Sequence, residues 1–149
     1  KTAIEIELRT GASLMPGDYG VGMSAGIGFT KMLGSTFIAE AGIEGGHFQP
    51  VTTDSKGFSP LGSFLGMGLF VPFENTAMIM GARARIGFDF AKWNPLSSAS
   101  FNTRFVWESR GRDGLVSFFP FVGFEGGYQY NGSHGGMALI SAGMIFDIE

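Results

Sequence analysis

The chain has 149 residues, enough for one domain, and its lack of cysteine excludes disulfides, thiolate chemistry and cysteine-ligated zinc. Only 15% of the residues are charged, against about a quarter in an average soluble domain, while glycine and phenylalanine are abundant. The net charge of -3 offers no basic surface for nucleic acid.

Side chains that alternate with a period of two predict eight β-strands joined by turns and loops. The first strand, 2–14, alternates aliphatic residues with Glu5, Glu7 and Arg9. In the second strand, 19–30, every second residue is mostly bulky and most residues between them are glycine. The remaining strands are expected at 36–46, 61–71, 77–90, 100–108, 115–130 and 137–148.

Two longer connections are expected, at 47–57 and 91–99, and they are candidate contact sites for a partner. Chain order places both at the end of the barrel away from the termini. Short turns, including a charged one at 109–114, are expected at the terminal end, which is the arrangement of outer-membrane barrels. Pro120 falls inside the seventh strand, where its missing N–H predicts a bulge or a local break.

The strand expected at 77–90 indicates which face points inward. One face carries Arg83, Arg85, Asp89 and glycine, and the other carries methionine, alanine, isoleucine and phenylalanine. A soluble sheet would bury the bulky face. However, no lysine falls within the body of an expected strand, and arginine is the cation that suits buried ion pairs. The pattern therefore predicts an all-β, closed, up-and-down antiparallel transmembrane barrel with its bulky face against lipid.

The inward charges are expected to form an ion-pair network that fills the lumen, because an eight-stranded barrel is just wide enough for side chains to fill. They are Glu5, Glu7, Arg9, Glu40, Glu44, Arg83, Arg85, Asp89, Arg104, Glu108 and Glu125. The same alternation predicts a lipid-facing set that comprises Met78, Met80, Ile86, Phe88, Phe105, Phe124, Ile140 and Met144.

The last strand ends in a motif that resembles the assembly signal of outer-membrane barrels. Ser141 is followed by Gly143 and then by Phe146 and Ile148 on alternate positions, although the chain ends in Glu149 instead of an aromatic residue. In size and strand count the chain resembles the small OmpA/OmpX-type barrels. The resemblance implies one domain, 1–149, integral to a bacterial outer membrane, in contact with its lipids and inserted by the barrel-assembly machinery. Lys1 leads straight into a strand, so no signal peptide is visible, as expected if a leader has been removed.

The expected function is that of a structural or interaction protein, such as a subunit of a larger envelope assembly, with no catalysis, cofactor, metal or nucleic acid. Three alternatives stay open: a narrow ion pathway through the lumen, a lipid-modifying enzyme and a soluble lipocalin-like barrel. For the enzyme, the candidate groups are Ser133 beside His134, and His47, Ser97 and Ser98 at other far-end positions.

Overall fold

The computed structural model describes residues 2–15, 18–51, 57–110 and 117–148. Within these ranges, only the backbone is described for residues 15, 18, 109 and 110. Its strands are β1 (Thr2–Met15), β2 (Asp18–Leu33), β3 (Phe37–Pro50), β4 (Pro60–Pro72), β5 (Thr76–Asp89), β6 (Asn94–Trp107), β7 (Ser109–Arg110), β8 (Ser117–Tyr130) and β9 (His134–Ile148). The described residues include no helix that is long and apolar enough to cross a membrane.

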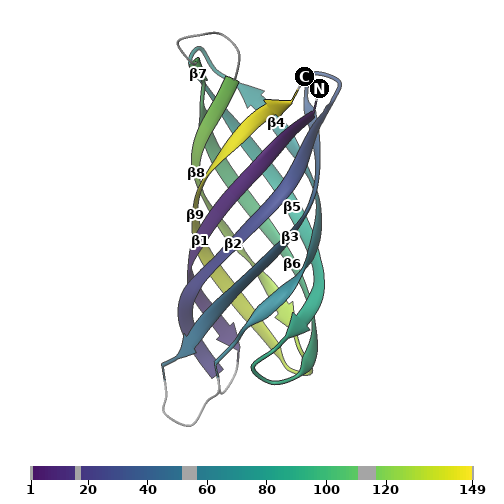
Figure 1. Cartoon of the computed structure of the whole chain (residues 1–149), viewed down its shortest axis with the longest axis vertical. Helices are drawn as coiled ribbons and strands as arrows, with labels where there is room; N and C mark the ends of the chain where they lie inside the picture. Colours follow the sequence, from purple (N-terminus) through teal and green to yellow (C-terminus); the bar gives the residue numbers. More distant parts are fainter. Residues whose placement is uncertain (1, 16–17, 52–56, 111–116, 149) are drawn as a thin grey trace.

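The strands form one closed antiparallel barrel. Each long strand pairs with its neighbours in chain order, and the pairings β1–β9 and β6–β8 close the ring. Figure 1 shows tilted strands around one axis, with both termini at the same end. The predicted fold class, with eight long strands, is therefore confirmed. These strands have 13 to 16 residues, more than the roughly 9–11 that a tilted strand needs to cross hydrocarbon.

The predicted bounds of the two longer connections were wrong. Residues 94–99 belong to β6, so only 90–93 join β5 to β6, and β3 continues to Pro50, so the connection to β4 is 51–59. Of the charged turn expected at 109–114, Ser109 and Arg110 form the short strand β7. Residues 52–56 and 111–116 lie outside the described part. β3 and β6 therefore extend further toward the far end than the sequence pattern indicates.

The break predicted at Pro120 occurs in one ladder only. β8 runs through Pro120, and its pairing with β9 continues there. The pairing of β8 with β6 stops at Val106 and Phe121, and it resumes with β7 at Ser109 and Phe118. In an antiparallel sheet, the N–H and C=O of one residue both point to the same neighbouring strand. The missing N–H of a proline can therefore interrupt the pairing with one neighbouring strand and leave the pairing with the other intact.

The barrel interior is layered along its axis. The middle layer holds most of the buried charged side chains. The terminal end holds an apolar cluster of Ala3, Ile38, Ala77, Ile79, Val106, Phe121 and Ile145. The far end holds a second apolar cluster of Phe48, Phe58, Met137 and Leu139. The sequence pattern predicted the charged layer but neither apolar layer.

Candidate functional site

Arg83, on β5, lies at the centre of the charged layer. Its guanidinium donates to Glu7 Oε2 at 2.8 Å and to Glu5 Oε1 at 3.1 Å, both on β1. It also donates through Nε to Glu40 on β3, and Glu125 on β8 lies 3.7 Å away. One buried arginine therefore links four strands across the lumen, using the planar fork that lysine lacks.

Arg104, on β6, joins the same carboxylates from the terminal side. Its Nη1 donates to Glu5 at 2.7 Å, and its Nη2 donates to Glu40 at 2.8 Å. The Thr30 hydroxyl also donates to Glu5, at 3.0 Å. The guanidinium carbon of Arg104 lies 5.8 Å from the ring centroid of Phe121, where the apolar layer begins. The two layers thus meet at Arg104.

Arg85 and Arg9 complete the network toward the far end. Arg85 donates to Glu44 and Glu125, each at 2.6 Å, and to the Ser100 hydroxyl at 2.7 Å. Arg9 pairs with Glu44 on β3 at 2.5 Å. The four arginines and five glutamates of this network are contributed by β1, β3, β5, β6 and β8, so ion pairs cross the lumen in several directions.

Glycines on the inner face leave room for these side chains. A Cβ at Gly66 would lie 2.6 Å from the Glu40 carboxylate, and a Cβ at Gly26 would lie 3.0 Å from Arg9 Nη2. Glu40 is held by two arginines and has little freedom to move aside. These glycines are therefore part of the charged site.

Two residues predicted for the network lie elsewhere. Asp89 is buried at the far end of β5, and its carboxylate accepts the backbone N–H groups of Ser59 and Ala91 at 2.9 and 3.0 Å. It fixes the two connections there. Glu108 is exposed, because β6 ends at Trp107 and the alternation that would turn Glu108 inward ends with it.

The outer wall carries the bulky face. Ile86, Ile140 and Phe124 are 69%, 64% and 59% exposed, whereas Phe88 is partly covered by Phe90 and Trp93. Met80, Phe105 and Met144 are exposed as well, and Met78 is half-buried. Among the outward-facing strand positions whose side chains are described, Lys31 alone is charged. A water-facing surface of this size would not be so uniformly apolar.

The residues of the assembly motif take both faces of β9. Ser141 is buried and faces the lumen, Ile148 is exposed, and Phe146 is half-buried. A Cβ at Gly143 would meet the Ile6 carbonyl oxygen and the Phe121 ring, so the glycine permits close strand packing. Recognition of this motif during assembly stays a prediction.

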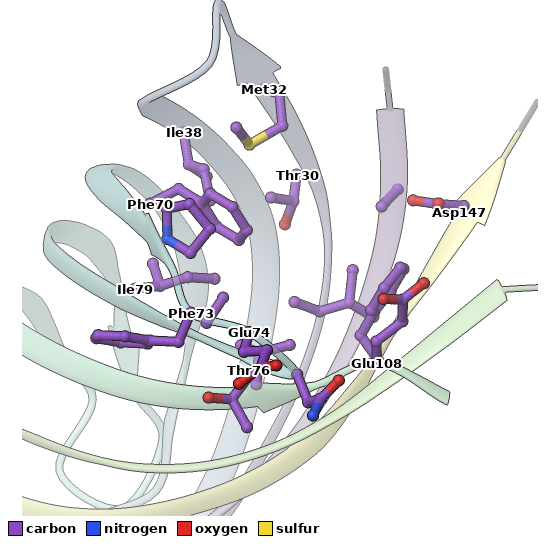
Figure 2. Close-up of a pocket in the computed structure, with 17 residues that line it drawn as sticks. Thr30, Met32, Ile38, Phe70, Phe73, Glu74, Thr76, Ile79, Glu108 and Asp147 are labelled. Carbon is purple, nitrogen blue, oxygen red and sulfur yellow. The ribbon is translucent and has the colours of Figure 1, made fainter. Parts of the chain in front are cut away.

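Sequence reasoning missed a cavity at the terminal end. It has a volume of about 330 Å³ and is lined largely by inward-facing apolar residues of the first cluster (Figure 2). Three carboxylates, those of Glu74, Glu108 and Asp147, also line it. The sequence does contain a signal for this cavity, because several strands carry apolar residues on both faces near the terminal end, as at Ile38 and Ile145.

Sequence reasoning also missed a serine–histidine contact at the far end. His47 Nδ1 lies 2.6 Å from the Ser59 hydroxyl, and Asp89 holds the backbone of Ser59. Ser133 and His134, the candidate pair of the enzyme alternative, are arranged differently: the His134 ring packs against the Tyr128 and Tyr130 rings, with centroids 5.5 and 4.9 Å apart. The 51–59 connection brings Ser59 to His47, which spacing in the sequence does not show.

Together these features define a closed eight-stranded antiparallel barrel with a charged lumen and an apolar wall. The structure is similar to the crystal structure of Neisserial surface protein A (NspA), with a TM-score of 0.68 and 10% sequence identity over 99% of this chain and 97% of that chain. No protein-family model matches the sequence, and no curated protein matches it significantly. At this identity the similarity establishes the fold.

Proposed function

We propose that the chain is an integral outer-membrane barrel with a closed lumen that acts as a structural or interaction protein. The observation that carries the proposal is the outer wall, where exposed aliphatic and aromatic residues surround the barrel and Lys31 is the one charge on the described outward positions. Such an apolar wall favours contact with the hydrocarbon core of a membrane. A β-sheet can make all its backbone hydrogen bonds there only when it closes into a barrel.

We also propose that side chains close the lumen. Ion pairs cross it from five strands, and apolar clusters lie above and below them. An ion that entered would have to separate these pairs in a poorly hydrated interior, at a high cost in free energy. Membrane lipids are the proposed surroundings, and the barrel-assembly machinery is the proposed partner during insertion, as the motif at the end of β9 indicates.

Heat-modifiable gel migration and planar-bilayer recordings test this function together. We expect the barrel to extract only with detergent, to migrate differently before and after boiling, and to show no conductance. Arg83→Ala should not produce conductance either, because the other three arginines still cross the lumen. Extraction without detergent would contradict the membrane location, and steady single-channel currents from the unaltered protein would contradict the closed lumen.

A second candidate function is the hydrolysis of a lipid ester at the far end of the wall. It rests on the 2.6 Å contact between His47 and the Ser59 hydroxyl, which is the spacing of a nucleophile and its base. A fluorophosphonate probe should then label the protein, and Ser59→Ala should abolish labelling. Ser97→Ala changes an exposed serine of β6 and should leave labelling intact. If the unaltered protein is not labelled, this candidate fails.

A further inference from the structure

We propose that Met80 and Thr103 form a site on the outer wall at which a hydroperoxide dissolved in the membrane oxidises the Met80 thioether. The two residues lie directly opposite each other on the neighbouring strands β5 and β6. The inference rests on the proposed membrane location, because hydrocarbon is the phase that brings an apolar hydroperoxide to the wall.

A shallow hollow in the outer wall surrounds this pair. It is lined by the side chains of Met67, Leu69, Met80, Phe101 and Thr103, together with glycine and alanine residues that keep it open. Phe101 is 77% exposed and Met67 is 61% exposed, so the sides of the hollow are apolar and project outward. An apolar molecule in the membrane can therefore lie in the hollow, next to the Met80 side chain.

Thr103 is the hydrogen-bonding side chain of the hollow. Its hydroxyl makes no hydrogen bond to the part of the chain that the structure describes. Thr10 on β1 also faces outward, but its hydroxyl donates to the carbonyl oxygen of Gly22 at 3.0 Å. A hydroxyl without a partner is unfavourable in hydrocarbon, so Thr103 favours a ligand that carries a hydrogen-bond acceptor.

The Met80 sulfur lies within reach of a ligand that Thr103 holds. Directly opposed residues of antiparallel strands have Cβ atoms about 4.5–5.5 Å apart. The methionine side chain is long, flexible and unbranched, and that of Met80 is 41% exposed. A hydroperoxide group that accepts a hydrogen bond from Thr103 is therefore placed beside the Met80 thioether.

The proposed reaction transfers one oxygen atom. The sulfur lone pair attacks the terminal oxygen of the R–O–O–H group, the O–O bond breaks, and the hydroperoxide proton moves to the oxygen bound to carbon, which leaves as the alcohol R–OH. The thioether is oxidised to a sulfoxide and the peroxide is reduced, so the step needs no further reactant. Thr103 donates to the leaving oxygen as negative charge develops there. In the product, Thr103 can donate to the sulfoxide oxygen, which hydrocarbon would leave without a partner.

Met23 and Met67 distinguish this site from simple exposure. Met23 is 60% exposed and lies opposite Thr10, whose hydroxyl is already engaged. Met67 is 61% exposed and lies between two alanines of the neighbouring strands. Both are more exposed than Met80, so both would react before Met80 if exposure alone governed oxidation. The proposed site predicts the reverse order.

Cumene hydroperoxide and hydrogen peroxide provide one membrane-soluble and one water-soluble oxidant. The protein in nanodiscs of saturated lipid is treated with each, and peptide mass spectrometry follows the added oxygen at each methionine. With cumene hydroperoxide we expect Met80 to be oxidised about tenfold faster than Met23 and Met67, which is the factor that one hydrogen bond supplies. Met137 is buried in the lumen and should stay unoxidised. Hydrogen peroxide should oxidise all three wall methionines slowly.

Three variants test the role of the hydroxyl. Thr103→Val keeps the branched side chain, removes the hydroxyl, and should lower the rate at Met80 to that at Met23. Thr103→Ser keeps a hydroxyl and should keep the fast rate. Thr10→Val is the matched control, because it removes a hydroxyl that is already bonded and should leave the rate at Met23 unchanged.

Two results would overturn the proposal in a barrel that is correctly inserted. They are oxidation of Met23 and Met67 before Met80, and an unchanged rate at Met80 in Thr103→Val. Failure of the proposed membrane location gives a different pattern, in which hydrogen peroxide oxidises the exposed methionines as fast as cumene hydroperoxide does, and it would overturn both proposals. Fast oxidation of Met80 that depends on the Thr103 hydroxyl would support the site.

Discussion

Arg83 shows how much one residue can contribute to this barrel. Its guanidinium meets Glu5, Glu7 and Glu40, and it also lies over the Phe64 ring, 4.9 Å from the centroid. Removing the cation would leave buried carboxylates with fewer partners. The cost of such a change is dominated by the charges that remain.

We therefore predict that Arg83→Ala lowers the free energy of unfolding by roughly 3–5 kcal/mol. Arg83→Lys should lose less, because it keeps the charge and loses the fork that spans several carboxylates. Urea unfolding in lipid vesicles measures both. A matched control is Ala84→Ser, on the outer face of the same strand. If Arg83→Ala destabilised the barrel no more than this control, the network would not hold the strands together.

Gly66 tests whether the lumen is as tightly filled as the contacts indicate. A Cβ at this position would meet the Glu40 carboxylate at 2.6 Å, so Gly66→Ala should cost roughly 1–3 kcal/mol through overpacking.

Gly126→Ala is the control for this test, because a Cβ there meets its nearest atom, the Met137 carbonyl oxygen, at 3.8 Å. It should leave the unfolding midpoint unchanged or raise it slightly. Equal midpoints for Gly66→Ala and Gly126→Ala would show that Glu40 can move aside freely.

The sequence predicts that Arg83 and Arg85 point into the lumen, because side chains alternate between the two faces of a strand. The partner of each arginine could not be predicted. Arg83 meets Glu40 and Arg85 meets Glu44 because β3 and β5 both flank β4 in a fixed register, which depends on the whole ring of strands.

At the scale of elements, the ends of strands are where sequence and structure differ. Residues 94–99 contain Asn94, Pro95 and two serines, which are typical of a loop, yet they pair with β5. Pairing across the ring overrides local propensity there. The same limit applied to Glu108, because a period of two cannot show where a strand stops.

β8 offers a test of the ladder near Pro120. Pro120→Ala restores an N–H where β8 faces the gap between β6 and β7. We predict that the amide at position 120 becomes protected from hydrogen exchange. The stability change should be small, because the gain of a hydrogen bond is offset by the lost rigidity of proline.

Exchange monitored by NMR measures this protection, with the amide of Phe124, in the intact part of both ladders, as the reference. Fast exchange at position 120 in the variant would show that the gap has a cause other than the missing N–H.

At the scale of the whole molecule, the defining feature of the barrel is which face of the sheet is outside. The charged face encloses the axis and the bulky face forms the wall, the reverse of a soluble barrel. Alternation together with the placement of lysine and arginine was enough to predict this. The layering of the lumen was not predictable in the same way, because it depends on which inward positions share a height on the barrel axis, and the strand register sets this.

The most direct test of this orientation is site-directed spin labelling in lipid bilayers, which needs no background removal because the chain has no cysteine. Labels at Leu65→Cys and Ile140→Cys, in the middle of the outer wall, are compared with a label at Ser133→Cys in the turn between β8 and β9. We predict frequent collisions with oxygen and rare collisions with a water-soluble nickel chelate at the first two sites, and the reverse at the third. Collisions with the chelate at Leu65 and Ile140 as frequent as at Ser133 would place the wall in water and contradict the account.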